Sequence, residues 1–269
     1  MIIDFHTHTF PDEIAEKSIS YLVKKGGLQP YRDGTLGSLK ESMRKSGVDY
    51  SLALPVATLP KQEKTINQLS VKLNGKDGVF FAGAIHPDCE SVEETLDFIK
   101  ESGLFAVKLH PDYQGVDFDD PRYLKIMSEA AKRGLIIVTH AGVDVAFRDH
   151  IHCTPDMILR VLDKLGEAIE NKLVLAHLGG YELPDESLEK LAGKPVYMDT
   201  AAVLKLYPEK CREIILRHGT DKILFATDSP WESQSDFIKI IKDFDLTQGQ
   251  QDEIFYKNAQ KLISSAKIN

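Results

Sequence analysis

The chain is poor in cysteine and in long apolar runs. Its 269 residues include only Cys89, Cys153 and Cys211. A small, odd and scattered set argues against a disulfide framework and fits a reducing compartment. No apolar run is long enough to span a bilayer, and the N-terminus lacks the basic flank and apolar core of a secretory signal. We therefore expect a soluble cytoplasmic protein with no membrane partner.

Basic charge is scarce as well. The sequence has 33 Lys and Arg against 41 Asp and Glu, a formal net charge of -8, and its basic residues form no cluster. Nucleic-acid binding needs clustered Lys and Arg, so a nucleic-acid partner is excluded. A Gly-rich loop after the first apolar run is also missing, because Thr-Phe-Pro-Asp-Glu stands there instead. This absence argues against an open dinucleotide-binding sheet.

What the chain does have is a regular alternation of short apolar runs and amphipathic stretches. Continuous apolar runs are typical of parallel strands that are buried on both faces. Eight such runs lie at 1–8, 50–55, 79–86, 105–110, 135–140, 173–177, 196–200 and 223–227. Strands that alternate with helices predict right-handed βαβ units. The count and length predict an α/β fold, a single (β/α)8 TIM barrel domain over residues 1–269.

Helix start and stop signals mark several of the intervening segments. They predict helices at Ser91–Glu101, Pro121–Arg133, Pro155–Leu165, Pro208–Arg217 and Gln248–Ala266. Three of these helices begin with proline, which is well suited to the first helical position. Thr154 is the expected N-cap of the helix Pro155–Leu165.

The opening sequence Asp-Phe-His-Thr-His places two imidazoles at the end of the first predicted strand. Residues two apart in a strand point to the same face, so Asp4, His6 and His8 are expected to line one side. Two imidazoles on one face can chelate a divalent metal.

Later strands end in the same way. His86, His110, His140, His177 and Asp228 each lie at or just after the C-terminal end of a predicted strand. In a barrel, these ends form the face that carries the active site. The polar residues are therefore expected to gather at one end of the molecule.

This placement predicts a metal site. Such a site needs about four convergent ligands, and His6, His8, His140 and Asp228 can supply them. Nitrogen and oxygen donors without a thiolate favour one divalent ion, Zn²⁺ first, with Mn²⁺, Fe²⁺ and Co²⁺ as alternatives. The ion would lower the pKa of bound water. Asp228 would then carry the proton, and His177 would polarise a substrate carbonyl or hold the water.

Six motifs run in order across nearly the whole chain: DFHTH at 4–8, GAIHP at 83–87, VKLHP at 107–111, VTHAG at 138–142, LAHLGG at 175–180 and ATDSPW at 226–231. Together they resemble the amidohydrolase superfamily, specifically its metal-dependent hydrolase branch known as amidohydrolase family 2. The resemblance implies a (β/α)8 barrel. It also implies a mononuclear metal on His6, His8, His140 and Asp228, with His177 as a catalytic neighbour. The family includes C–N and C–O hydrolases and non-oxidative decarboxylases.

Lys108 has two interpretations. It shares a strand face with His110 and, once carboxylated, would bridge two metals as in binuclear members of the superfamily. The alternative, which we favour, is a buried lysine paired with a carboxylate such as Asp4. His86 precedes a proline and is expected to have only a structural role at the end of its strand.

Three residues are candidates for substrate contact. His110 ends a strand on the expected active-site face, and Trp231 follows the Asp228 turn. Arg148 lies in the connection 141–153, from which its guanidinium would pair with a substrate carboxylate. Each has an alternative interpretation. His110 would be a hydrogen-bonded histidine at the barrel rim, Trp231 would pack against its own helix, and Arg148 would lie in a solvated surface loop.

These observations predict a metal-dependent hydrolase of a small amide, lactone or ester, and a substrate with a nearby carboxylate would suit the site. A decarboxylase on the same metal site is the alternative. A phosphoesterase is disfavoured because Asp228-Ser-Pro stands where polymerase-and-histidinol-phosphatase domains close with Asp-x-His. A barrel that binds ligand without turnover is disfavoured because both Asp228 and His177 are kept. The resemblance also points to a homodimer.

Overall fold

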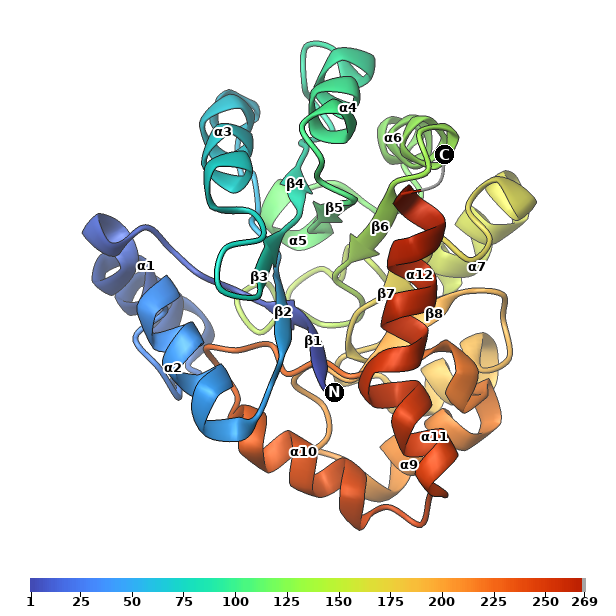
Figure 1. The fold of residues 1–269 in the computed structure, drawn as a ribbon. Helices are drawn as coiled ribbons and strands as arrows, with labels where there is room; N and C mark the ends of the chain where they lie inside the picture. Colours follow the sequence, from blue (N-terminus) through green and yellow to red (C-terminus); the bar gives the residue numbers. More distant parts are fainter. Residues whose placement is uncertain (268–269) are drawn as a thin grey trace.

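The computed structural model describes residues 1–267, in which short parallel strands form a barrel surrounded by helices (Figure 1). The strands are β1 (Ile3–Thr7), β2 (Tyr50–Ala53), β3 (Val79–Phe81), β4 (Gly83–Ala84), β5 (Ala106–Leu109), β6 (Ile136–Thr139), β7 (Leu173–Leu175), β8 (Tyr197–Asp199) and β9 (Ile223–Leu224). Their hydrogen-bonded order is β1-β2-β3 and β4-β5-β6-β7-β8-β9. Only Ala82 separates β3 from β4, so the two continue as one strand and all eight predicted strands are present.

Backbone hydrogen bonds join the first strand to the segment that follows the last. The Phe5 amide donates to the Phe225 carbonyl at 2.9 Å, and the Asp228 amide donates to the His6 carbonyl at 2.9 Å. Farther along, the His8 amide donates to the Ser229 carbonyl at 2.6 Å. These bonds close the sheet into the predicted (β/α)8 barrel.

The longer helices are α1 (Asp12–Gly26), α2 (Leu36–Ser46), α3 (Glu63–Leu73), α4 (Val92–Glu101), α6 (Pro121–Lys132), α7 (Pro155–Leu165), α9 (Pro208–His218), α10 (Gln234–Asp243) and α12 (Asn258–Lys267). The short ones are α5 (Pro111–Gln114), α8 (Pro184–Glu186) and α11 (Gln248–Asp252). No helix of the described chain is long and apolar enough to cross a membrane.

The predicted helices are found with small shifts at their ends. The Thr154 hydroxyl caps α7 by accepting a hydrogen bond from the Met157 amide at 3.2 Å. The predicted C-terminal helix is continuous but changes its winding, because the π-helical segment Glu253–Lys257 joins α11 to α12. Within that segment, the Ile254 carbonyl accepts a hydrogen bond from the Phe225 amide at 2.9 Å, which ties the helix to β9.

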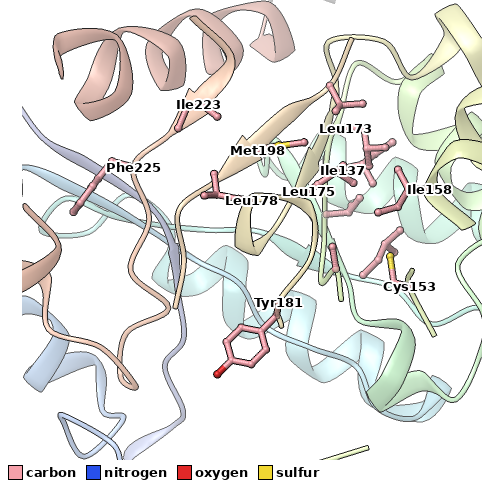
Figure 2. Packing of buried hydrophobic residues seen from close by; sticks show 14 of the residues in the cluster. Ile137, Cys153, Ile158, Leu173, Leu175, Leu178, Tyr181, Met198, Ile223 and Phe225 are labelled. Atoms are coloured by element: carbon pink, nitrogen blue, oxygen red, sulfur yellow. The ribbon is translucent and has the colours of Figure 1, made fainter. Parts of the chain in front are cut away.

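The core lies mainly between the strands and the surrounding helices. In the part that Figure 2 shows, Ile137 of β6 and Leu173 and Leu175 of β7 pack beside Ile158 of α7. A second apolar cluster joins residues at the start of the strands, such as Ile3 and Phe5, to α12. That packing covers the end of the barrel at which the strands begin and leaves the other end for the polar residues.

The first strand is irregular, and this overturns one expectation. The register between β1 and β2 shifts between Asp4 and Thr7, so the strict alternation of side chains is lost. Asp4 consequently contacts Thr227 and Gln234, with its Oδ2 atom 2.6 Å from Thr227 Oγ1 and 2.8 Å from Gln234 Nε2. Asp4 therefore does not line the polar end of the barrel together with His6.

Candidate metal centre and active-site cavity

Three side-chain atoms converge at the carboxyl end of the barrel. His6 Nε2 lies 3.1 Å from His8 Nε2 and 3.5 Å from Asp228 Oδ1, and His8 Nε2 lies 3.2 Å from that same oxygen. We call this group the His6 cluster (His6, His8 and Asp228). It joins residues 222 positions apart in the sequence, because closing the barrel places the last strand beside the first.

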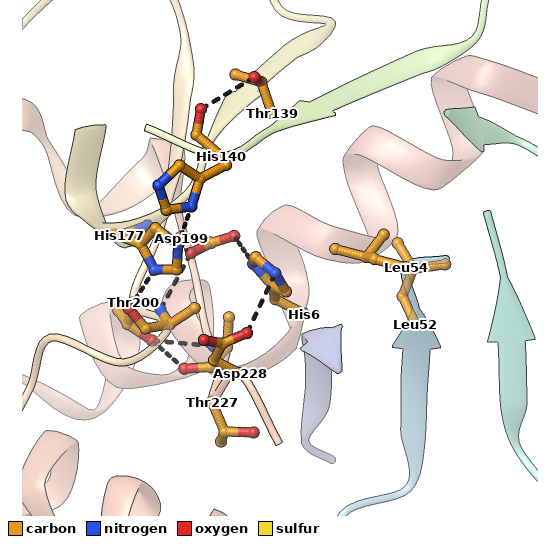
Figure 3. Close-up of polar contacts among 12 residues, drawn as sticks. His6, Leu52, Leu54, Thr139, His140, His177, Asp199, Thr200, Thr227 and Asp228 are labelled. Carbon is orange, nitrogen blue, oxygen red and sulfur yellow. Dashed lines mark hydrogen bonds and ion pairs between the residues drawn. The ribbon is translucent and has the colours of Figure 1, made fainter. Parts of the chain in front are cut away.

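The opposite nitrogen of each imidazole fixes its tautomer. His8 Nδ1 donates to the Leu54 carbonyl at 2.8 Å, and a carbonyl can only accept. His6 Nδ1 lies 2.9 Å from Asp199 Oδ2 and donates to this carboxylate (Figure 3). With the protons on Nδ1, both Nε2 atoms direct lone pairs at each other and at Asp228. A carboxylate or carbonyl behind the imidazole is the arrangement usual for metal-ligating histidines.

The cluster also fits a metal in size and charge. Tetrahedral Zn²⁺ with nitrogen and oxygen ligands at about 2.0–2.1 Å holds these atoms about 3.3 Å apart, and the three distances here are 3.1, 3.2 and 3.5 Å. Burial and the charge of Lys108 lower the pKa of His6 well below its usual value, which keeps the ring neutral. Burial raises the pKa of Asp228, whereas contact with His8 and positive charge on His6 or His8, when these rings are protonated, lower it.

Unusual backbone geometry orients the side chains of Asp228 and of the nearby His177. Asp228 has a φ of 67°, and His177 and Leu178 have φ values of 59° and 51°. Non-glycine residues adopt this left-handed conformation at a cost, and such residues gather at functional sites. Asp228 does not cap the next helix, since Ser233 is the N-cap of α10.

His140 and His177 continue the polar end from the neighbouring strands (Figure 3). His177 Nδ1 donates to the Ala201 carbonyl at 2.9 Å, so its Nε2 is an acceptor and takes a hydrogen bond from His140 Nδ1 at 3.0 Å. His140 Nε2 is then unprotonated, and it is buried without a hydrogen-bond partner. The ring lies in a second group, which we call the His110 cluster (His110, His140 and Asp144).

The His110 cluster is less well satisfied. The rings of His110 and His140 stack with centroids 4.5 Å apart, and His110 Nε2 lies 3.6 Å from Asp144 Oδ2. Asp112 Oδ2 lies 3.7 Å from His140 Nε2. Neither Asp112 Oδ2 nor His110 Nδ1 has a hydrogen-bond partner, although both atoms are buried. Burial raises the pKa of Asp144 to about 6.

Lys108 lies beside the His6 cluster. Its Nζ atom is 3.3 Å from His6 Nε2, and Asp199 and Asp228 are the carboxylates that act on its charge. Burial lowers the pKa of Lys108 to about 8. The predicted pairing with Asp4 is wrong, because the irregular register of β1 turns Asp4 toward Thr227.

Two of the three predicted substrate contacts line a cavity at this end. The cavity has a volume of about 1,610 Å³, and both His110 and Trp231 border it. Its innermost polar lining comprises His6, His8, Lys108, His110, His140, His177 and Asp228.

Arg148 is not among the residues that line this cavity, so the structure does not support its predicted contact with a substrate carboxylate. Its guanidinium forms a two-pronged ion pair with Glu182, at 2.7 and 2.8 Å. His86 is structural as expected, since its Nδ1 accepts from the Asp88 amide at 3.0 Å.

Comparison with known proteins shows the family of the chain. The model of the family described as amidohydrolase matches residues 3–264. The chain belongs to this family. No curated protein sequence matches this amidohydrolase.

Solved structures share its fold at low identity. A 2,6-dihydroxybenzoate decarboxylase from Rhizobium has a TM-score of 0.73 at 15% identity, over 98% of both chains. A dihydroxybenzoic acid decarboxylase from Polaromonas, solved with manganese and an inhibitor, has a TM-score of 0.71 at 14% identity, over 98% of this chain and 96% of that one. A probable 2-pyrone-4,6-dicarboxylic acid hydrolase from Acinetobacter baumannii has a TM-score of 0.67 at 17% identity, over 98% and 99%. At this identity they establish the barrel fold.

Sequence reasoning missed several groups that position the amidohydrolase's site. Asp199 is the next-to-last residue of the predicted strand 196–200 and could have been found by the same strand-end rule as the histidines. Asp112 lies in the short helix α5 and Asp144 in a loop, both a few residues after a strand end, where spacing does not indicate the direction of the side chain. The Leu54 carbonyl is a backbone atom and leaves no signal in the sequence.

Proposed function

We propose that this amidohydrolase is a metal-dependent hydrolase of a small amide, lactone or ester. The convergence of three proton-free donor atoms in the His6 cluster, at the inner end of a large cavity, carries this proposal. His6, His8 and Asp228 would hold one divalent metal. His140 would supply a fourth ligand, because its Nε2 atom has no hydrogen-bond partner and is available to bind the metal. Zn²⁺ is the first choice for this donor set, with Mn²⁺, Fe²⁺ and Co²⁺ as alternatives.

A bound divalent metal would act as a Lewis acid that polarises a carbonyl group and lowers the pKa of water. Asp228 would be ionised in the loaded site, because the positive charge of a bound metal favours the carboxylate form. Its carboxylate would accept a proton from the attacking water and pass it to the leaving group.

The neighbouring side chains would orient the reactants. His177 is held by the Ala201 carbonyl. Its Nε2 atom would accept a hydrogen bond from the water, in place of the one that it accepts from His140 Nδ1, and so orient the water. Buried Lys108 would place a positive charge near a substrate oxygen. His110 and Trp231 border the cavity and would contact the substrate.

Non-oxidative decarboxylation is the second candidate. Two of the structures similar in fold are decarboxylases of dihydroxylated benzoic acids. Lys108 also supports it, because a buried cation beside the His6 cluster would pair with a substrate carboxylate. We rank hydrolysis first because the Asp228 carboxylate lies among the donor atoms, 3.2 Å from His8 Nε2 and 3.5 Å from His6 Nε2, where it can accept a proton from a water molecule held there.

The two reactions release different products. Zn²⁺- or Mn²⁺-loaded protein would be assayed on lactones, esters, amides and carboxylated aromatics. Proton release would report hydrolysis of esters and lactones, amine release would report hydrolysis of amides, and CO₂ release would report decarboxylation. We expect hydrolysis that falls by about 10³-fold or more in Asp228→Asn, since the variant loses the proton acceptor. Circular dichroism and thermal unfolding would establish that the variant is folded. Near-normal turnover in a folded Asp228→Asn protein would rule out the proton-carrier role.

A further inference from the structure

Helix α1 has an apolar face that the protein leaves largely uncovered. Of its 15 residues, only Ala15 and Ile19 are buried. Ile14 and Tyr21 are 47% and 57% exposed. An amphipathic helix normally buries such a face against the core. Figure 1 shows α1 at the outer edge of the molecule, beyond the ring of helices that covers the barrel.

The exposed apolar side chains gather around the mouth of the active-site cavity. Among the described residues, ten large apolar side chains are exposed, and five of these line the cavity. The five are Ile14, Tyr21, Leu28, Leu59 and Leu206. They come from α1 and from three loops that are far apart in the sequence. Exposed apolar side chains that border one cavity in this way are typical of a ligand-binding groove.

The cavity continues this apolar surface inward to the reactive groups. Leu22 of α1, Ile66 and Leu69 of α3, and Val143 and Val145 of the loop after β6 form part of its wall. His6, His8 and Asp228 line the same cavity. Its volume of about 1,610 Å³ exceeds the range of about 300–1,000 Å³ that is usual for small-ligand sites. The space is therefore larger than a single-ring substrate needs.

We infer that the substrate carries an extended apolar arm, such as an alkyl or acyl chain, which lies between α1 and α3 while its amide, ester or lactone group reaches the His6 cluster. The inference rests on the proposed function for the location of the reacting group. Continuity of the apolar wall with the reactive end favours a substrate chain over a protein partner. Acyl amides, acyl esters and alkyl-substituted lactones are the substrate classes that fit.

Binding of inert ligands tests this inference without turnover. Acetohydroxamate and octanohydroxamate share a metal-chelating head and differ in chain length. Their affinities for Zn²⁺-loaded protein would be measured by isothermal titration calorimetry. Each buried methylene tightens binding by about threefold, so we expect octanohydroxamate to bind roughly 100-fold or more tightly than acetohydroxamate.

Two double variants test where the alkyl chain of the hydroxamate lies. Ile14→Glu with Leu59→Glu places two charges on the groove at positions exposed enough to tolerate them, and should reduce the chain-length advantage at least tenfold. The matched control is Phe98→Glu with Leu216→Glu, because these side chains are 41% and 42% exposed and lie outside the cavity lining. The control should retain the full advantage. Equal affinities of the two hydroxamates for the wild type, or an advantage that survives in the groove variant, would overturn the inference.

Acetate and octanoate, which have the same chain lengths but a carboxylate in place of the hydroxamate, separate the contribution of the alkyl arm to affinity from that of the metal-chelating head. A chain-length advantage without any preference for hydroxamate over carboxylate would support the groove and contradict the metal site. A hydroxamate preference without a chain-length advantage would do the reverse. If chain length has no effect and light scattering shows a dimer that the groove variant makes monomeric, a second copy of the chain covers α1 and the inference is wrong.

Discussion

The His6 cluster and the His110 cluster lie side by side and differ in how their members are held. In the first, Asp199 and the Leu54 carbonyl hold the two imidazoles from behind. In the second, three buried atoms of the cluster and adjacent Asp112 have no hydrogen-bond partner, and these are His110 Nδ1, His140 Nε2 and Asp112 Oδ2.

The difference separates two tasks. Metal affinity requires ligands fixed in orientation and tautomer before the metal arrives, and the His6 cluster meets this requirement. A buried polar atom without a partner costs about 1–3 kcal/mol, and the cost is offset when a ligand supplies the missing bond. We therefore expect the His6 cluster to hold the metal and the His110 cluster to contact the substrate or complete the coordination.

The largest effect should come from removing the imidazoles of one cluster and then the other. Replacing both His6 and His8 by alanine should abolish metal binding, because one oxygen of the three convergent donor atoms remains. His110→Ala should keep close to one metal per chain while it loses activity. Elemental mass spectrometry of the purified proteins measures the metal content. Full metal retention in the His6→Ala, His8→Ala protein would show that the centre lies elsewhere. Two metals per wild-type chain would revive the carboxylated Lys108.

A weaker effect should follow from changing the support behind His6. In Asp199→Asn, an amide N–H can face His6 Nδ1 and shift the ring proton to Nε2, which blocks the lone pair. We expect Zn²⁺ affinity to fall by about 10–100-fold, which is typical for loss of a residue that supports a metal ligand. Competition with a chromophoric chelator measures it.

Asp144→Asn is the matched control for Asp199→Asn, because it changes an acid of the His110 cluster and should alter Zn²⁺ affinity less than about threefold. Equal losses in the two variants would contradict the division of tasks between the clusters.

Particular residues show what the sequence could and could not predict. The eight strands and the Thr154 cap follow from apolar runs and local capping chemistry, which act over a few residues. The strand-end rule also identified His6, His8 and Asp228. The orientation of Asp4 was not predictable, because it depends on a shift in the pairing of β1 with β2.

Long-range partners explain the contacts that the sequence did not indicate, while the predicted substrate contact of Arg148 stays a prediction. Arg148 pairs with Glu182, which is 34 positions away, and loop conformation rather than sequence pattern decides that contact. The support of His8 by Leu54 is similar, since it involves a backbone carbonyl of the neighbouring strand connection.

The pH dependence of stability offers a smaller test of the His110 cluster. Burial raises the pKa of Asp144 to about 6, above the value of about 3.9 in an unfolded chain. Between these values the folded state binds the extra proton. The contribution of Asp144 to stability is therefore full below about pH 4 and is lost as pH rises through about 6.

Urea unfolding of metal-free wild type and Asp144→Asn should reveal this loss. From pH 4 to pH 7, the free energy of unfolding of the wild type should fall by about 2 kcal/mol relative to the variant. The difference between the two proteins cancels Asp4, whose pKa burial also raises to about 6. A parallel pH dependence in both proteins would mean that Asp144 is not buried in this way.

The smallest effect is expected at Arg148, in the same loop as Asp144. Its side chain is 56% exposed and its charge is already paired with Glu182. Exposed pairs contribute about 0–1 kcal/mol, so Arg148→Ala should leave the free energy of unfolding within about 1 kcal/mol. The ratio of kcat/KM for a carboxylate-bearing substrate to that for its neutral analogue should change less than about twofold, because an exposed paired guanidinium contributes little. A selective loss of tenfold or more for the carboxylate-bearing substrate would mean that the loop moves Arg148 into the cavity when substrate binds, and the His110 cluster would then share its role with a residue that the free structure places outside it.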